Sequence, residues 1–352
     1  MPYSPLMTAQ PSASRDPYLH QDVLAARTVF IAAKRADRPL DWERDPLDKP
    51  FVSRQNAAGD RRRAGCPFCA GNESLTPPDV LRVPAHSSVG DWHARIIPNR
   101  FPIVDDFSAL LTDRSLDASA PRLAHGVHEV VIESATHEHS ILAVEATRWC
   151  DVWNLCQRRL AMLAERSDLA WATVFKNSGR DSGASIEHLH SQLVALDFVP
   201  PVIAAELSAA QKTRQPFQDL LNHARDTGCV VAEAGDLVAL VPPAPRQPFE
   251  NWILPREPEP YFHLTSPERV RALATLTQLL VLKLERLVPG AAYNWWLHQA
   301  PFAKPPHKPA GNWHWHLEIL PRLSDFAGFE LATGCHITTL SPRESARQLR
   351  EA

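Results

Sequence analysis

Two histidines, a serine and a glutamine lie close together in the apolar segment HLHSQLVAL, residues 188–196. If this segment is a strand, alternate side chains share a face, so His188, His190 and Gln192 would lie on one surface. The preceding loop, GRDSGASIE at 179–187, contains glycines and hydroxyl side chains. Such a loop can direct its backbone N–H groups toward a bound anion. An imidazole beside such a phosphate cradle is a candidate nucleophile. A solvated strand edge would show the same alternation and is the alternative interpretation.

A pair of cysteines, Cys66 and Cys69, has the spacing of a zinc knuckle. A structural zinc needs four ligands, and the best remaining donors in the same half of the chain are His137 and His188. A redox CxxC is the alternative, but it would typically open a helix in a βαβ setting, which this stretch lacks. The pair therefore favours metal binding over redox chemistry.

A second set of histidines lies near the end of the chain. His298 ends one predicted strand, and His314 and His316 share a face of the next, among several tryptophans. Three histidines with a carboxylate would make a metal site of harder character. The same residues could equally be the aromatic edge of a core, and the residues alone leave both interpretations open.

The predicted elements that carry these residues occur twice. The hydrophobic pattern of each half predicts a strand, a long helix and two further strands. In the first half these are 128–134, 144–165, 171–177 and 188–196, and in the second 249–255, 267–287, 293–298 and 314–320. This repeat predicts a duplicated α+β fold, with a flexible tail at 1–25, one domain at 26–199 and another at 200–352.

Composition narrows the class of protein. The 352 residues have 37 basic and 40 acidic side chains, a net charge of -3, which gives no electrostatic reason to bind nucleic acid or a membrane surface. No apolar run reaches the roughly eighteen residues of a spanning helix, and the opening residues lack the pattern of a secretion signal. We therefore expect a cytoplasmic enzyme that binds neither nucleic acid nor membrane.

Taken together, the motifs resemble the galactose-1-phosphate uridylyltransferase family of the histidine-triad superfamily, including its ADP-glucose phosphorylase relatives. The resemblance runs from about Arg35 to the C-terminus. Its strongest pieces are GCPFCAGN, IPNRFP, HEVVIES followed by His137, KNSG, HLHSQ, FENWILP and HWHLEILPRLSDFAGFE. The resemblance implies a duplicated histidine-triad-like fold with two antiparallel sheets, each packed with helices.

The resemblance also implies roles for the residues around the nucleophile. His190 would attack the α-phosphorus of a nucleotide sugar and form a nucleotidyl-histidine, which a second phosphate then collects. Gln192 would donate a hydrogen bond to a phosphoryl oxygen, and Ser185 would hold a phosphate. Asn99 of IPNRFP and Asn177 of KNSG would belong to the nucleotide site.

Further residues are implied at the sugar, the phosphates and the metals. Arg35 and Arg38 would contact phosphates, and Glu330 would bind sugar hydroxyls, reaching in from the partner subunit of a homodimer. The first metal site would be a structural zinc, and the second would hold zinc or iron. Their implied ligands are Cys66, Cys69, His137 (with His139 as the local rival) and His188 for the first site, and Glu206, His298, His314 and His316 for the second.

The expected activity is that of a UDP-glucose:hexose-1-phosphate uridylyltransferase, with a nucleotide sugar and hexose 1-phosphate as substrates. Leu189 departs from the proline usual between the two histidines of uridylyltransferases, and its context is closer to the ADP-glucose phosphorylase branch. That branch often builds its second metal site with another CxxC, which this chain lacks. The alternatives are therefore an ADP-glucose phosphorylase-like enzyme that uses inorganic phosphate, and a catalytically silent nucleotide-binding protein.

Overall fold

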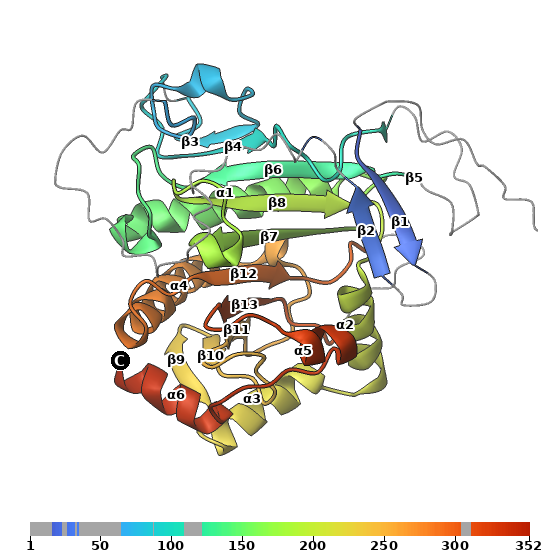
Figure 1. Ribbon diagram of the computed structural model, residues 1–352, viewed down its shortest axis with the longest axis vertical. Coiled ribbons are helices and arrows are strands. Elements are labelled where there is room, and N and C mark those ends of the chain that lie inside the picture. The colour runs from blue at the N-terminus through green and yellow to red at the C-terminus, as the bar shows by residue number, and fades with distance from the viewer. Residues whose placement is uncertain are drawn as a thin grey trace, which may run out of the picture.

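The computed structural model describes residues 16–22, 27–31, 34, 65–86, 88–108, 122–303 and 311–352. Ten of the strands in these residues form one antiparallel sheet (Figure 1). In spatial order they are β3 (Leu81–Val83), β4 (Ala94–Pro98), β6 (Gly126–Ile132), β8 (His190–Leu196), β7 (Trp171–Ser178), β12 (Tyr293–His298), β13 (His316–Pro321), β11 (Asn251–Pro255), β10 (Leu237–Leu240) and β9 (Val230–Ala234). A smaller sheet has the order β2 (Arg27–Ile31), β1 (Tyr18–Asp22) and β5 (Arg122–Leu123).

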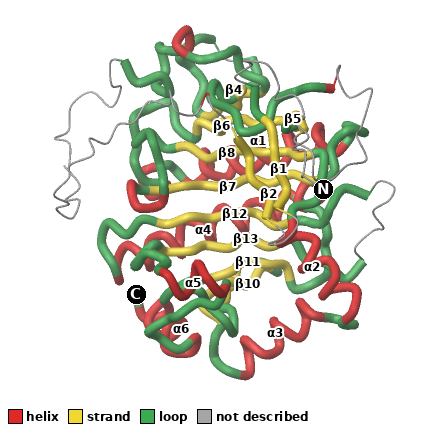
Figure 2. Tube along the Cα trace, turned by 45° about the vertical axis from the view of Figure 1, so that its right-hand side comes forward, coloured by secondary structure: helices red, strands yellow, loops and turns green. Residues whose placement is uncertain are grey.

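The predicted repeat is present as two matching halves of the large sheet. The first half has the order β6, β8, β7 and the second the order β11, β13, β12, and the halves meet where β7 pairs with β12 (Figure 2). The predicted α+β fold with antiparallel strands is therefore confirmed. The two predicted sheets are joined into one, because the backbone from Phe175 to Ser178 pairs with that from Tyr293 to Trp296.

Two long helices, α1 (Ala146–Ala164) and α4 (Pro267–Leu287), correspond in the repeat and pack against each other on one face of the sheet (Figure 1). The indole N–H of Trp149 on α1 donates to the hydroxyl of Thr277 on α4 over 2.9 Å, in the core that both halves share. The remaining described helices are α2 (Pro201–Lys212), α3 (Pro216–Asp226), α5 (Gly328–Thr333) and α6 (Pro342–Glu351). Within the described residues, no helix has the length and apolar character needed to cross a membrane.

Local chemistry explains where the paired helices begin. The Glu145 carboxylate accepts the backbone N–H of Thr147 at the start of α1, over 3.1 Å. The Ser266 hydroxyl accepts that of Arg269 at the start of α4, over 3.3 Å, with Pro267 at the first helical position. Both contacts satisfy N–H groups that lack a partner within the helix.

Some elements differ from the sequence prediction. The tail predicted at 1–25 contains β1, which pairs in antiparallel register with β2. Its sequence, YLHQD, shows no alternation of apolar and polar residues, so periodicity gave no signal there. The hairpin of β9 and β10 was also missed, because every residue of β10 is buried and a strand buried on both faces does not alternate.

Gly126 allows β6 and β8 to come together at the end of the pair where it lies opposite Leu196, the far end from His190. A Cβ atom at this position would lie 2.2 Å from the carbonyl oxygen of Ala195. We predict that Gly126→Ala lowers the free energy of unfolding by about 2 kcal/mol, because backbone atoms cannot move aside as a flexible side chain can. Urea denaturation measures this change.

Gly328→Ala is the matched control, since its added methyl group would meet no atom within 4 Å. If Gly126→Ala and Gly328→Ala had the same free energy of unfolding, the close approach of β6 and β8 at Gly126 would be contradicted.

Candidate active site and candidate metal groups

A cavity of about 360 Å³ lies at the start of β8, next to the Cys66–Cys69 loop. It brings together four predicted site residues that are far apart in the sequence: Asn99, Ser185, His190 and Gln192. Apolar side chains form the rest of much of its wall, among them Phe68, Leu75, Ile97, Val130 and Ile186. An apolar cavity with a few converging polar groups is the usual form of a small-molecule site.

The ring of His190 is held in a defined orientation. Its Nδ1–H donates to the carbonyl oxygen of His188 over 2.8 Å, and its ring lies 5.4 Å from that of Phe68 between centroids. In a neutral imidazole only one ring nitrogen carries a proton, so this contact makes Nε2 the nitrogen with the lone pair. The backbone contact at His188 therefore assigns the lone pair of a neutral His190 ring to Nε2.

Behind the cavity, a fully buried ion pair supports the same strand. The Lys176 ammonium donates to the carbonyl oxygen of His190 over 2.8 Å and pairs with the Glu133 carboxylate, which also accepts the Ser191 hydroxyl. Burial lowers the pKa of Lys176, and the charge of Glu133 opposes that effect. Sequence reasoning missed this pair, although a lysine in the apolar segment WATVFKNS was a signal for a buried partner.

Other predicted substrate residues lie elsewhere. The side-chain oxygen of Asn177 accepts the amide of Asn294 on β12 over 2.8 Å, and Asn177 is not among the cavity residues. Glu330 lies on α5, where its carboxylate accepts the N–H of Ala327. Its expected role across a homodimer stays a prediction. Arg35 and Arg38 lie outside the described residues.

The first candidate metal group contains Cys66, Cys69, His137 and His188, whose donor atoms all lie within 4.8 Å of one another. The Nδ1 atom of His188 is 3.5 Å from the Cys66 sulfur and 3.6 Å from the Cys69 sulfur. Its Nε2–H donates to the carbonyl oxygen of Ser134 over 2.9 Å, so Nδ1 carries the lone pair that a metal requires. The rival histidine, His139, is not part of this group.

The charge state of this group also suits a bound cation. Burial, together with the neighbouring Cys69, raises the pKa of the Cys66 thiol to about 11. Burial likewise lowers the pKa of His188 to about 3, so its imidazole is neutral. Thiolate ligands at this position would need the charge of a metal ion, and two sulfurs with two imidazoles form a common zinc-binding set.

The second candidate metal group contains Glu206 on α2, His298 on β12, and His316 and Glu318 on β13. The Nδ1 atom of His298 is 3.0 Å from a Glu206 oxygen and 3.5 Å from a Glu318 oxygen. Two buried atoms of the group, Oε2 of Glu206 and Nε2 of His316, have no hydrogen-bond partner. Buried polar atoms are normally satisfied, so these two atoms suit coordination of a metal ion.

The remaining member of the predicted second set, His314, lies outside this group. Its Nδ1–H donates to the carbonyl oxygen of Pro255 over 2.8 Å, and its ring stacks on Phe217. His314 forms an isolated bridge with Glu259 just before β13 begins at His316. Burial alone would raise the pKa of Glu318, but its contacts with His316, His298 and Arg246 lower it to about 2.

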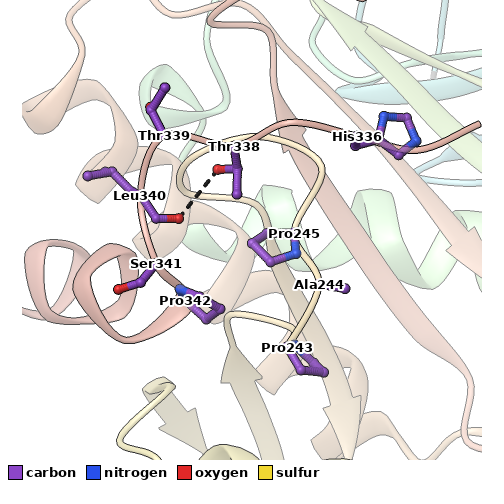
Figure 3. Close-up of a pocket in the computed structure, with 9 residues that line it drawn as sticks. All are labelled: Pro243, Ala244, Pro245, His336, Thr338, Thr339, Leu340, Ser341 and Pro342. Atoms are coloured by element: carbon purple, nitrogen blue, oxygen red, sulfur yellow. Dashed lines mark hydrogen bonds between the residues drawn. The ribbon is translucent and has the colours of Figure 1, made fainter. Parts of the chain in front are cut away.

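A separate surface cavity of about 430 Å³ lies between the loop at 243–245 and the segment at 336–342 (Figure 3). It is lined by Pro243, Ala244, Pro245, His336, Thr338, Thr339, Leu340, Ser341 and Pro342. None of the predicted site residues is among these lining residues, so this surface cavity is not the candidate active site.

Comparisons with known proteins agree with this fold. A family model described as "Domain of unknown function (DUF4921)" matches residues 104–351. An ADP-glucose phosphorylase of Arabidopsis thaliana is 30% identical over 343 residues, covering 96% of this chain and 93% of that protein. A galactose-1-phosphate uridylyltransferase of Thermotoga maritima is 24% identical over 298 residues, covering 81% of this chain and 89% of that protein.

A solved structure gives the same result. The crystal structure of an ADP-glucose phosphorylase from Arabidopsis thaliana, with ADP-glucose bound to that protein, is similar with a TM-score of 0.73 and 28% identity. It covers 96% of this chain and 99% of the other. The fold and these relatives together identify the chain as a nucleotidyltransferase. The chain belongs to the galactose-1-phosphate uridylyltransferase-like family, and its DUF4921 match covers most of its length.

The two metal groups predict two independent metal equivalents. Cys66→Ser should remove about one equivalent and Glu318→Gln about one other, because each substitution removes a donor from a different group. His314→Ala should keep both equivalents, since His314 is not in either group. Elemental analysis of the purified variants measures the metal content.

Thermal unfolding of each variant provides the control for loss of fold. Retention of both equivalents in Cys66→Ser would contradict the first group. Loss of a metal equivalent in His314→Ala but not in Glu318→Gln would contradict the second group, which contains Glu318 and not His314.

Proposed function

We propose that this enzyme transfers a nucleoside monophosphate from a nucleotide sugar through a covalent intermediate on His190. The observation that carries the proposal is the contact between His190 Nδ1 and the His188 carbonyl oxygen, which assigns the lone pair to Nε2 at the cavity. Ser185 and Gln192 lie in the same cavity and offer hydrogen-bond donors to a phosphate. A silent nucleotide-binding protein would not need a ring oriented in this way.

The reaction then has two in-line steps. In the first, His190 Nε2 attacks the α-phosphorus, a P–N bond forms, and the bond from that phosphorus to the bridging oxygen breaks. The electron pair leaves with the sugar phosphate. In the second, an oxygen of the acceptor phosphate attacks the same phosphorus, and the P–N bond breaks. The Gln192 amide and the Ser185 hydroxyl would stabilise the charge on the phosphoryl oxygens in both steps.

The apolar part of the cavity would hold the nucleoside. Phe68, Ile97 and Val130 line the wall beside His190, and a planar base gains from contact with aromatic and aliphatic side chains. Binding of the base at this wall would place the α-phosphate near the polar side chains at the start of β8.

The two metals would have different chemistry. We assign zinc to the thiol and imidazole donors around Cys66, where a bound ion would fix the loop that packs against His190. The carboxylate and imidazole donors around His316 suit zinc or iron. Both sites would be structural, since neither group includes a residue of the cavity.

The donor we propose is ADP-glucose, with inorganic phosphate as the acceptor. This choice rests on similarity to the Arabidopsis thaliana phosphorylase, which extends over 96% of this chain. UDP-glucose with a hexose 1-phosphate acceptor is the second candidate. It is favoured by the group of Glu206, His298 and His316, which belongs to the set expected of uridylyltransferases.

Isotope exchange tests the covalent route. Labelled glucose 1-phosphate should enter ADP-glucose in the absence of phosphate, because the first step is reversible on its own. His190→Ala should lower the exchange rate by at least about a thousandfold, since it removes the attacking nitrogen. The same assay with UDP-glucose compares the two donors.

His223→Ala, a change of an exposed histidine on α3, is the control and should exchange at the wild-type rate. Exchange by His190→Ala at the wild-type rate would refute the assignment of the nucleophile. Faster exchange with UDP-glucose than with ADP-glucose would reverse the choice of donor.

A further inference from the structure

A buried histidine on β6, His128, contacts the cavity residue Gln192 from behind. The Nε2 atom of His128 is 2.9 Å from Oε1 of Gln192. On the other side of the ring, Nδ1 is 3.0 Å from the backbone nitrogen of Ile103. His128 is itself absent from the cavity lining, so it acts on the cavity through Gln192.

The backbone contact determines which ring nitrogen of His128 is protonated. A backbone N–H can only donate, so Nδ1 must accept the hydrogen bond from Ile103 with its lone pair. In a neutral imidazole the proton is then on Nε2. His128 therefore donates, and the atom of Gln192 that faces it must be the carbonyl oxygen.

Asn99 cannot take the place of Gln192 as the acceptor. Its Nδ2 atom is 3.0 Å from His128 Nε2, but its Oδ1 atom accepts the backbone N–H of Phe101 over 2.8 Å. The Asn99 amide therefore presents its NH₂ group to His128 Nε2, and an NH₂ group cannot accept a hydrogen bond, whereas rotating the amide would break the hydrogen bond from Phe101. Of the two amides beside His128, the one that presents an oxygen to its Nε2–H is that of Gln192.

We propose that His128 is a positioning residue that fixes the Gln192 amide with its NH₂ group toward the cavity. With Oε1 engaged by His128, the NH₂ group is the part of the amide that can meet a ligand, and it suits a phosphoryl oxygen. Without His128, the amide can rotate by half a turn and present its oxygen to the phosphate, which would repel it. This inference rests on the proposed nucleotidyl transfer.

The chain contains a second histidine with the same construction, His125, which serves as a matched control. Its Nδ1 accepts the backbone N–H of Phe107 over 3.0 Å, and its Nε2–H donates to the Asp168 carboxylate over 2.7 Å. Arg166 pairs with the same carboxylate. His125 is fully buried, and it is not among the residues that line the cavity.

A double-mutant cycle separates positioning from a general structural effect. The exchange rate is measured for wild type, His128→Phe, Gln192→Ala and the double variant. His128→Phe should lower the rate by about tenfold to a hundredfold. This is the range for loss of a charge-assisted hydrogen bond, here the bond from the Gln192 NH₂ group to a phosphoryl oxygen. In the Gln192→Ala background the same change should have no further effect, because the amide it orients is gone. An equal loss in both backgrounds would overturn the proposal.

Two further variants complete the test. His128→Gln should recover most of the rate, because its amide nitrogen can donate to Gln192 from nearly the same place as Nε2. His125→Phe should lower the melting temperature and leave the exchange rate unchanged. A rate loss for His125→Phe equal to that for His128→Phe would assign the effect to packing and overturn the proposal.

The protonation of His128 is measured without catalysis. Long-range ¹H–¹⁵N spectra of histidine-labelled protein, assigned with His128→Phe, should show the proton of His128 on Nε2. A proton on Nδ1 would overturn the proposal even if exchange is observed. Absence of exchange in the wild type, with the proton on Nε2, would refute the proposed function and leave the orientation of Gln192 intact.

Discussion

The start of β8 is the point on which the candidate active site depends, because contacts to both its backbone and its side chains hold it in place. His188 carries a donor of the first metal group, and its carbonyl oxygen accepts Nδ1–H of His190. The carbonyl oxygen of His190 accepts a hydrogen bond from the Lys176 ammonium, and the side-chain oxygen of Gln192 accepts one from His128. Successive residues of a strand point to opposite faces, so one short segment connects the metal group, the cavity and the buried ion pair.

The duplication shows how one arrangement can serve two purposes. At the start of β13, the Nδ1–H of His316 donates to the carbonyl oxygen of His314 over 3.0 Å, as His190 does to His188 over 2.8 Å. In the second half, however, Glu206 and Glu318 lie around the imidazole that corresponds to His190. Carboxylates there suit a cation and would repel a phosphate, so the two halves differ in the charge that each can bind.

Much of the fold could be predicted from sequence because the paired helices and inner strands have strong periodicity. The helix predicted at 267–287 and the strand predicted at 293–298 have the bounds found in the structure. The joining of the two halves through β7 and β12 could not be predicted, since nothing in either strand's own sequence identifies the strand that pairs with it. Hydrogen bonds between distant residues, such as that of His128 with Gln192, depend on register and leave no local pattern.

Residues of the site could be predicted only where reactive residue types occur at a characteristic spacing in a short motif, as in CPFC and HLHSQ. Glu318, Glu133 and Lys176 were missed because a single charged residue in a strand does not reveal its partner. The central claim of the account is the covalent intermediate on His190. Intact-protein mass spectrometry after incubation with ADP-glucose, followed by peptide mapping, tests it most directly. The account predicts one added nucleoside monophosphate on the peptide that contains His190, whereas no added mass, or the same addition in His190→Ala, would contradict it.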